Sequence, residues 1–235
     1  MISNIILIFI LYQGKIFYEL TSLGIPNYEF MLVKKAIWKN DAWLLDWTVD
    51  YFETPINKQF CKDNFYYGQT TLAIASCWSR YELVDRLIKL GANPNIPDNF
   101  GRTPLIWALE HAGENGERAK KCIHFLLKAG ANANITVKPF AGSYSPLVKA
   151  ANTGADYVDI LIKAGAKVDF DAGGLTALQH IVQYGTEKPI EIESLKTLIK
   201  HMANTNIKDE TGQTPKEHAR KQKKMIFLSI LEQGQ

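Results

Sequence analysis

Four segments of the chain share one apolar pattern, in which two adjacent hydrophobic residues are followed by two more after one helical turn. The four sets are Leu83, Val84, Leu87 and Ile88; Cys122, Ile123, Leu126 and Leu127; Tyr157, Val158, Leu161 and Ile162; and Ile226, Phe227, Ile230 and Leu231. This spacing places the apolar side chains in one stripe along a helix, and the stripe must be buried against another element. The pattern therefore predicts a helix at each segment.

A shorter helical stretch precedes each segment and begins with Thr or Ser, in most copies followed by Pro. The starts are Gly68-Gln69-Thr70-Thr71-Leu72, Gly101-Arg102-Thr103-Pro104-Leu105, Ser143-Tyr144-Ser145-Pro146-Leu147, Gly174-Leu175-Thr176-Ala177-Leu178 and Gly212-Gln213-Thr214-Pro215. Thr or Ser is a good helix N-cap, and Pro suits the first helical position because its missing N–H has no partner there anyway. Gly91, Gly130 and Gly165 follow the longer helices, where a left-handed residue often ends a helix.

The whole unit returns about every 33 residues, a period typical of stacked repeats. At these residues the chain resembles the ankyrin repeat family, with a specific signature from about residue 66 to 231 and a weaker one over 27–63. The resemblance implies an all-α ankyrin-repeat solenoid, in which helix-turn-helix units stack and are joined by β-hairpin-like loops. We expect full repeats at 66–98, 99–136, 141–170 and 171–208, with a degenerate N-terminal cap at 27–63 and a C-terminal capping repeat at 209–235, so that one domain covers 27–235.

Two features depart from a regular array. The period is lengthened at 113–116, 136–142 and 185–189, which we interpret as surface loops between helices or repeats. The family usually has His after Thr-Pro-Leu, where it links neighbouring loops by hydrogen bonds. The corresponding residues here are Ala73, Ile106, Val148, Gln179 and Glu217. Their replacement predicts a stack that is held more by apolar packing.

The N-terminal segment, residues 1–26, is separate from this pattern. Its stretch Ile5 to Tyr12 is wholly apolar, yet far shorter than the ~20 residues that span a bilayer. Three interpretations stay open: a strand or helix packed on the end of the stack, residues added by a wrong start site, or a targeting signal. We expect no membrane-spanning segment.

Composition narrows the class of protein further. The net charge is +3, and the chain carries no nucleic-acid-binding motif, so we do not expect a nucleic-acid partner. Cys61, Cys77 and Cys122 form neither an even set nor a C-x-x-C pair, which is typical of reduced thiols in an intracellular protein. We therefore expect a cytoplasmic location, or the host cell cytoplasm if the chain is a secreted bacterial effector.

No constellation of catalytic residues is present in the sequence. Its five histidines are scattered without metal-ligand spacing, and no glycine loop of the phosphate-binding type occurs. Cys77 lacks a paired motif that would supply a base. Because the repeats also occupy almost the whole chain, we predict that the protein is not an enzyme and uses no cofactor and no metal.

The family resemblance implies binding on the concave face, at hairpin tips and first helices, and it points to residue types that are enriched at interface hot spots. Carried over position by position, the partner-binding candidates are Tyr66, Tyr67, Gln69, Trp78, Asn99, Phe100, Arg102, Glu110, His111, Tyr144, Asn152 and Tyr184. We expect a monomeric scaffold or adaptor that binds a protein or peptide. The alternative is a structural or regulatory subunit that docks to a membrane or larger assembly through its apolar N-terminus.

Overall fold

The computed structural model describes residues 28–51, 55–60, 68–138 and 143–233. It divides into two compact units, Met1–Pro55 and Ile56–Gln235. The predictions for residues 1–26, and those for Tyr66 and Tyr67, lie outside the described residues.

The first unit contains a pair of helices, α2 (Tyr28–Lys39) and α3 (Ala42–Tyr51), which pack on each other. The chain reverses between them through Asn40, whose φ is 54°. Asp41 then caps α3, because its Oδ1 accepts a hydrogen bond from the Leu44 N–H at 2.9 Å. The pair occupies the range that the sequence assigns to a degenerate first repeat, and its role as a cap stays a prediction.

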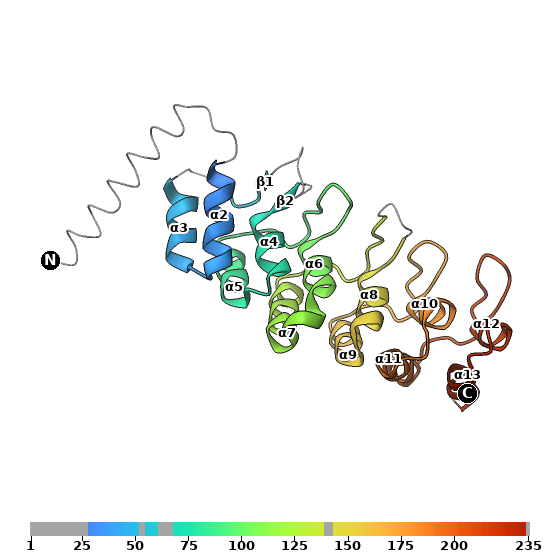
Figure 1. Cartoon of the computed structure of the whole chain (residues 1–235). Helices are drawn as coiled ribbons and strands as arrows, with labels where there is room; N and C mark the ends of the chain where they lie inside the picture. Colours follow the sequence, from blue (N-terminus) through green and yellow to red (C-terminus); the bar gives the residue numbers. More distant parts are fainter. Residues whose placement is uncertain (1–27, 52–54, 61–67, 139–142, 234–235) are drawn as a thin grey trace. The chain divides into compact units, whose positions relative to one another are not determined.

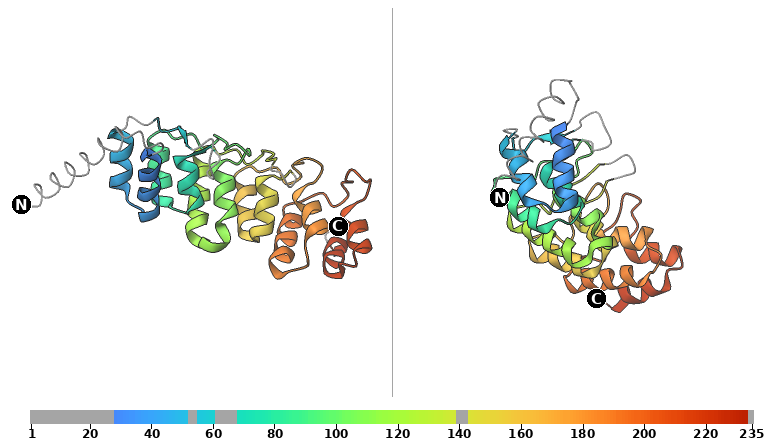
Figure 2. Two further views of the ribbon diagram at one scale, coloured as in Figure 1. Left: turned by 45° about the horizontal axis from the view of Figure 1, so that its top comes forward. Right: turned by 60° about the vertical axis from the view of Figure 1, so that its left-hand side comes forward.

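The second unit is a stack of five helix pairs in two layers (Figures 1 and 2). The first helices of the pairs are α4 (Thr71–Cys77), α6 (Pro104–Glu110), α8 (Pro146–Thr153), α10 (Ala177–Tyr184) and α12 (Pro215–Lys221). The second helices are α5 (Tyr81–Lys89), α7 (Ala112–Lys128), α9 (Ala155–Lys163), α11 (Pro189–Lys200) and α13 (Met225–Gln233). Each first helix packs on the next first helix and on its own second helix. This arrangement confirms the predicted all-α solenoid.

Extended backbone is short and lies in the loops between pairs. Strands β1 (Gln59–Phe60) and β2 (Gln69–Thr70) are antiparallel, with Gln59 opposite Thr70. Val137 and Tyr144 form one further antiparallel bridge. The loops that lead into α6, α10 and α12 extend to the same side of the stack, above the first helices in Figure 1.

The predicted helix starts are present in the structure. The side chains of Thr70, Ser145, Thr176 and Thr214 each accept a hydrogen bond from a backbone N–H in the first turn of their helix. Thr103 is also at the N-cap of its helix, but its side chain makes no capping hydrogen bond. The Thr/Ser starts therefore position every first helix at the same point of its repeat.

The predicted glycine ends are present too. Gly91, Gly130 and Gly165 have φ of 90°, 85° and 96°. At Gly91 the following residue, Ala92, donates its N–H to the Leu87 carbonyl at 3.0 Å, which closes the end of α5.

The apolar stripes form the core. Leu83, Val84 and Leu87 are at most 1% exposed, and the equivalent first three residues of the stripes on α7 and α9 are also buried. Burial of one such side chain stabilises the fold by about 1.5–3 kcal/mol. The stripe on α13 differs, because Ile226 is 47% exposed at the last helix of the stack.

A row of asparagine side chains connects the turns that follow the second helices. Asn95 accepts a hydrogen bond from the Asn132 N–H at 2.8 Å, and its amide donates to the Gly130 carbonyl at 2.9 Å. Asn134 repeats both bonds one step along the stack, with Lys167 N–H at 2.8 Å and the Gly165 carbonyl at 3.1 Å. We call Asn95 and Asn134 with these partners the asparagine seam.

The expectation that the stack is held more by apolar packing stays a prediction, but polar links between repeats are present as well. The asparagine seam supplies polar links on the turn side of the stack. On the other side, Gln179 occupies one of the positions where the family usually has His, and its amide donates to the Ile207 carbonyl at 3.2 Å.

The extension at 113–116 also differs from the prediction. Most of the stretch is helical: α7 covers Ala112 to Lys128, with a break in the helical backbone at Gly116, where φ is 40° and ψ is −109°. A glycine accommodates this backbone conformation because it has no Cβ. The kink therefore divides α7 into two helical parts that meet at Gly116.

Candidate partner-binding surface

The hairpin tip before α6 is built around the carboxylate of Asp98. One oxygen accepts the N–H groups of Phe100 and Arg102, both at 2.9 Å. The other lies 2.9 Å from Arg102 Nε, and the Asp98 side chain is fully buried. A buried carboxylate must be paired in this way, because an unpaired charge in the interior is strongly destabilising. The tip therefore holds the Arg102 side chain in place.

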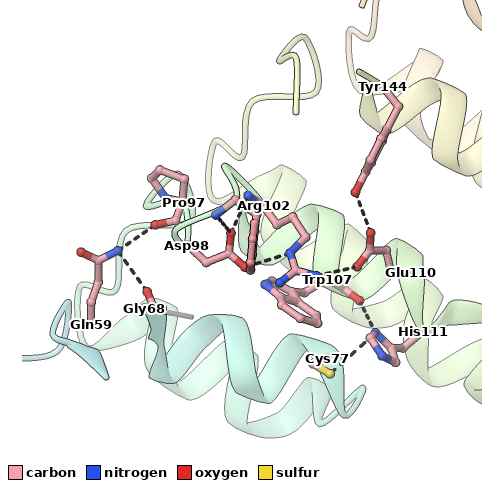
Figure 3. A network of polar contacts seen from close by, with 11 residues as sticks. Gln59, Gly68, Cys77, Pro97, Asp98, Arg102, Trp107, Glu110, His111 and Tyr144 are labelled. Carbon is pink, nitrogen blue, oxygen red and sulfur yellow. Dashed lines mark hydrogen bonds and ion pairs between the residues drawn. The ribbon is translucent and has the colours of Figure 1, made fainter. Parts of the chain in front are cut away.

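Arg102 is the centre of a cluster that spans two repeats (Figure 3). Its guanidinium lies 3.9 Å from the centroid of the Trp107 ring and 5.0 Å from that of Phe100. One of its terminal nitrogens is 3.8 Å from a Glu110 oxygen. The other Glu110 oxygen accepts a hydrogen bond from the Tyr144 hydroxyl, in the next repeat, at 2.6 Å. We call these five residues the Arg102 cluster.

Tyr144 is fixed as a hydrogen-bond donor in this cluster. Burial, followed by the hydrogen bond to the Glu110 carboxylate, raises its pKa well above the ordinary value. The phenol is therefore neutral across the physiological pH range. Arg102 carries one positive charge against the carboxylates of Asp98 and Glu110, so the neighbourhood has an excess of one negative charge.

A second set of candidates lies at the ends of the first helices. Trp78, His111, Thr153 and Tyr184 each stand the same number of residues after the N-cap of their helix, so they occupy equivalent places in successive repeats. Trp78 is 44% exposed and Tyr184 is 61% exposed, which is unusual for rings of this size. We call these four residues the helix-end row.

The structure places a base near Cys77 that the sequence does not reveal. The sulfur lies 3.6 Å from His111 Nδ1, and the same nitrogen is 3.2 Å from the Trp107 carbonyl oxygen. A carbonyl can only accept a hydrogen bond, so Nδ1 carries the proton in the tautomer that donates to Trp107. That nitrogen then cannot take a proton from the thiol, and the pair is not arranged as a nucleophile with its base.

The remaining candidates from the sequence differ in how far they are exposed to solvent. Asn99 and Asn152 are exposed, whereas Gln69 is 4% exposed in β2 and does not present its side chain to a partner. The interaction role of the whole set stays a prediction.

Asp98 and Trp107 were missed by the sequence reasoning. For Asp98 a signal exists, since Asp also stands three residues before a tip glycine at Asp171 and Asp209. The carboxylates of Asp171 and Asp209 each accept hydrogen bonds from backbone N–H groups of their own hairpin tip, as the carboxylate of Asp98 does.

Among residues 28–51, 55–60, 68–138 and 143–233, no group of three or more His, Cys, Asp or Glu side chains could hold a metal ion. Within the same ranges, no helix combines the length and the apolar character needed to cross a bilayer.

Curated proteins similar to this chain match it over part of its length. A glycerophosphocholine phosphodiesterase of Schizosaccharomyces pombe is 36% identical over 117 residues, which is 48% of this chain and 10% of that protein. Neurogenic locus notch homolog protein 1 of Xenopus tropicalis is 29% identical over 150 residues, covering 63% of this chain and 5% of that protein. The chain thus spans about a tenth or less of the length of these relatives.

Solved structures match more of the chain. An ankyrin repeat domain of Acinetobacter baumannii is 27% identical with a TM-score of 0.66, covering 86% of this chain and 96% of that one. A second match is a chain in the structure of a Bdellovibrio bacteriovorus predatory endopeptidase in complex with an immunity protein. Its TM-score is 0.70 at 23% identity, and the match covers 87% of this chain and 98% of that one.

The family model "Ankyrin repeats (3 copies)" matches residues 33–138 and 112–209. These two matches together cover well over half of the sequence and include the helix pairs from α4 to α11. This chain therefore belongs to the ankyrin repeat family.

Proposed function

We propose that the chain is a non-catalytic scaffold that binds a protein or peptide partner on its concave face, along the hairpin tips and the helix-end row. Ankyrin repeats are generally protein–protein interaction modules. The observation that carries the proposal is the exposure of Trp78 and Tyr184 at equivalent helix ends. Exposed Trp and Tyr side chains are the types that most often act as hot spots.

The Arg102 cluster supports a role in partner binding because it makes the hairpin tip rigid. Its charges and its tyrosine hydroxyl are already paired with one another, so the tip between the repeats is held in one conformation before a partner arrives. A preorganised surface loses less conformational entropy on binding, which favours affinity.

Non-catalytic action is supported by the arrangement at Cys77. Cys77 lacks a paired base in the sequence but has a neighbouring histidine in the structure, and in the tautomer that donates to the Trp107 carbonyl the proton is on the nitrogen that faces the sulfur. We infer binding without chemistry.

The test is affinity capture followed by quantitative binding of the captured protein. Three forms of the chain are compared: unmodified, Trp78→Ala with Tyr184→Ala, and a control with Leu90→Ala and Met202→Ala. The control residues are 43% and 85% exposed at the ends of second helices, so they remove similar apolar area from another part of the surface.

We expect the control to keep its affinity and the helix-end variant to lose at least about thirtyfold, since one hot-spot residue contributes roughly 2 kcal/mol or more. Urea unfolding of each form checks that folding is intact. Equal binding by all three forms would rule out the helix-end row as the partner surface.

A further inference from the structure

A groove of about 560 Å³ lies beside the starts of α7, α9 and α11, where the first helix of each pair turns into the second. Its lining includes Gly116, Lys120, Gly154, Tyr157, Ile190 and Glu193. The volume is in the range of ligand-binding pockets. Three consecutive repeats contribute to the lining. Two of these repeats contain the stretches at 113–116 and 185–189 that lengthen the regular period, and the proposed scaffold function gives neither stretch a role.

The second helices pack unevenly along the stack. Helix α5 packs on α7 and α9 packs on α11, whereas α7 and α9 have few close contacts with each other in the described part of the chain. The kink at Gly116 lies in the lining of this opening, so the stretch that breaks the regular period forms part of the groove wall.

The inner wall of the groove is apolar and firmly held. The Tyr157 ring is 6% exposed, and its hydroxyl is 3.4 Å from the Ala112 carbonyl and 3.3 Å from the Gly116 carbonyl. Opposite the start of α9, Ile190 is 44% exposed, and its side chain approaches the bare backbone of Gly154. An exposed isoleucine beside the small exposed part of a buried aromatic ring offers a place for one apolar side chain.

The rim of the groove carries an unbalanced negative charge. The Lys120 ammonium donates to Asp156 at 2.6 Å and to Glu117 at 3.0 Å, so two carboxylates share one positive charge. The Asp156 and Glu117 side chains are 72% and 81% exposed, while the Lys120 side chain is 24% exposed. Glu193 is paired separately with Lys196. One negative charge thus faces solvent at the entrance.

We propose that this groove binds a peptide segment that places one apolar side chain against Tyr157 and Ile190 and an adjacent Lys or Arg at Asp156. Charge complementarity selects the basic neighbour, because it neutralises the carboxylate that Lys120 leaves uncompensated. The groove and the helix-end row are tested by different variants, so the two proposals can fail separately.

Gly113 offers a clean way to fill the groove. Gly113 lines the groove, a Cβ added there would meet no atom within 4 Å, and the backbone φ of this residue is not in the left-handed region. Helix propensity also favours leucine over glycine within a helix. Gly113→Leu should therefore fold and occupy part of the opening. Asp156→Asn removes the selecting charge with almost no change of shape.

The experiment measures fluorescence polarisation with the full chain and three fluorescein-labelled peptides of the form Gly-Ser-X-Z-Ser-Gly. The pairs at X-Z are Leu-Arg, Leu-Glu and Ser-Arg. We expect Leu-Arg to bind at least tenfold more tightly than either other peptide, and this preference over Leu-Glu should weaken with added salt.

Variants then assign the binding to the groove. Gly113→Leu should weaken Leu-Arg binding at least tenfold, and Asp156→Asn should reduce the preference over Leu-Glu to less than threefold. The Trp78→Ala, Tyr184→Ala form should bind as the unmodified chain does. No binding of Leu-Arg at millimolar peptide, equal binding of Leu-Glu, or unchanged binding by Gly113→Leu would each overturn the proposal.

Discussion

Replacing Asn134 with alanine removes both of its hydrogen bonds in the asparagine seam. Its Oδ1 accepts the Lys167 N–H at 2.8 Å, and its amide donates to the Gly165 carbonyl at 3.1 Å. Each bond contributes a net ~0.5–1.5 kcal/mol in a typical protein. Because both are exposed to solvent, we take the lower part of that range and expect a loss of about 1–2 kcal/mol in the free energy of unfolding.

The assay is equilibrium unfolding in urea followed by circular dichroism. With a urea dependence of about 3 kcal/mol per molar, the expected loss lowers the midpoint by roughly 0.5 M. Asn206→Ala is the matched control. Asn206 stands at the equivalent place of the last such turn, its N–H is held by Asn204 in the same way, and within residues 143–233 its side chain makes no hydrogen bond to a following repeat.

The difference in unfolding free energy between the two variants measures the contribution of the hydrogen bonds between repeats, because both variants change the local turn in the same way. The reasoning would be refuted if Asn134→Ala cost no more stability than Asn206→Ala, since the seam would then contribute nothing beyond the conformation of each turn.

Three further predictions follow from single contacts. Tyr144→Phe removes the donor to Glu110 and should lower unfolding free energy by ~1–2 kcal/mol in the same urea assay, with no loss if the hydroxyl is instead satisfied by water. Gly130→Ala introduces a Cβ at φ 85° without any steric neighbour, so the melting temperature should fall through backbone strain alone, by the equivalent of about 1 kcal/mol. The hydroxyl of Thr211 and then other donors hold the pKa of Asp209 below its ordinary value, so this carboxylate stabilises the fold above about pH 4 and loses that effect as the pH falls further. Asp209→Asn should therefore flatten the acid limb of a stability-against-pH curve, and an unchanged limb would contradict the assignment.

The fold could be predicted from the sequence because its determinants are local. Thr103-Pro104 at a helix start and Gly130 at a helix end act within a few residues, and the apolar stripe on α7 needs only the helical period. These signals recur in each repeat, so a weak copy is supported by the strong ones.

The connections between repeats could not be predicted in the same way. Asn95 and Asn134 look like ordinary polar turn residues until their partners, about one repeat away, are in place. The contact of Arg102 with Trp107 depends on how the tip folds back over α6. The kink at Gly116 also has no local signature, because a glycine in that stretch is equally compatible with a loop.

The asparagine seam also determines how the stack responds to mechanical load. Its bonds at Asn95 and Asn134 join different pairs of turns, so a force applied between the two ends of the stack reaches them in series. Links in series carry the same force, so the weakest repeat gives way first while the others stay folded. The stack should therefore extend in steps of one repeat.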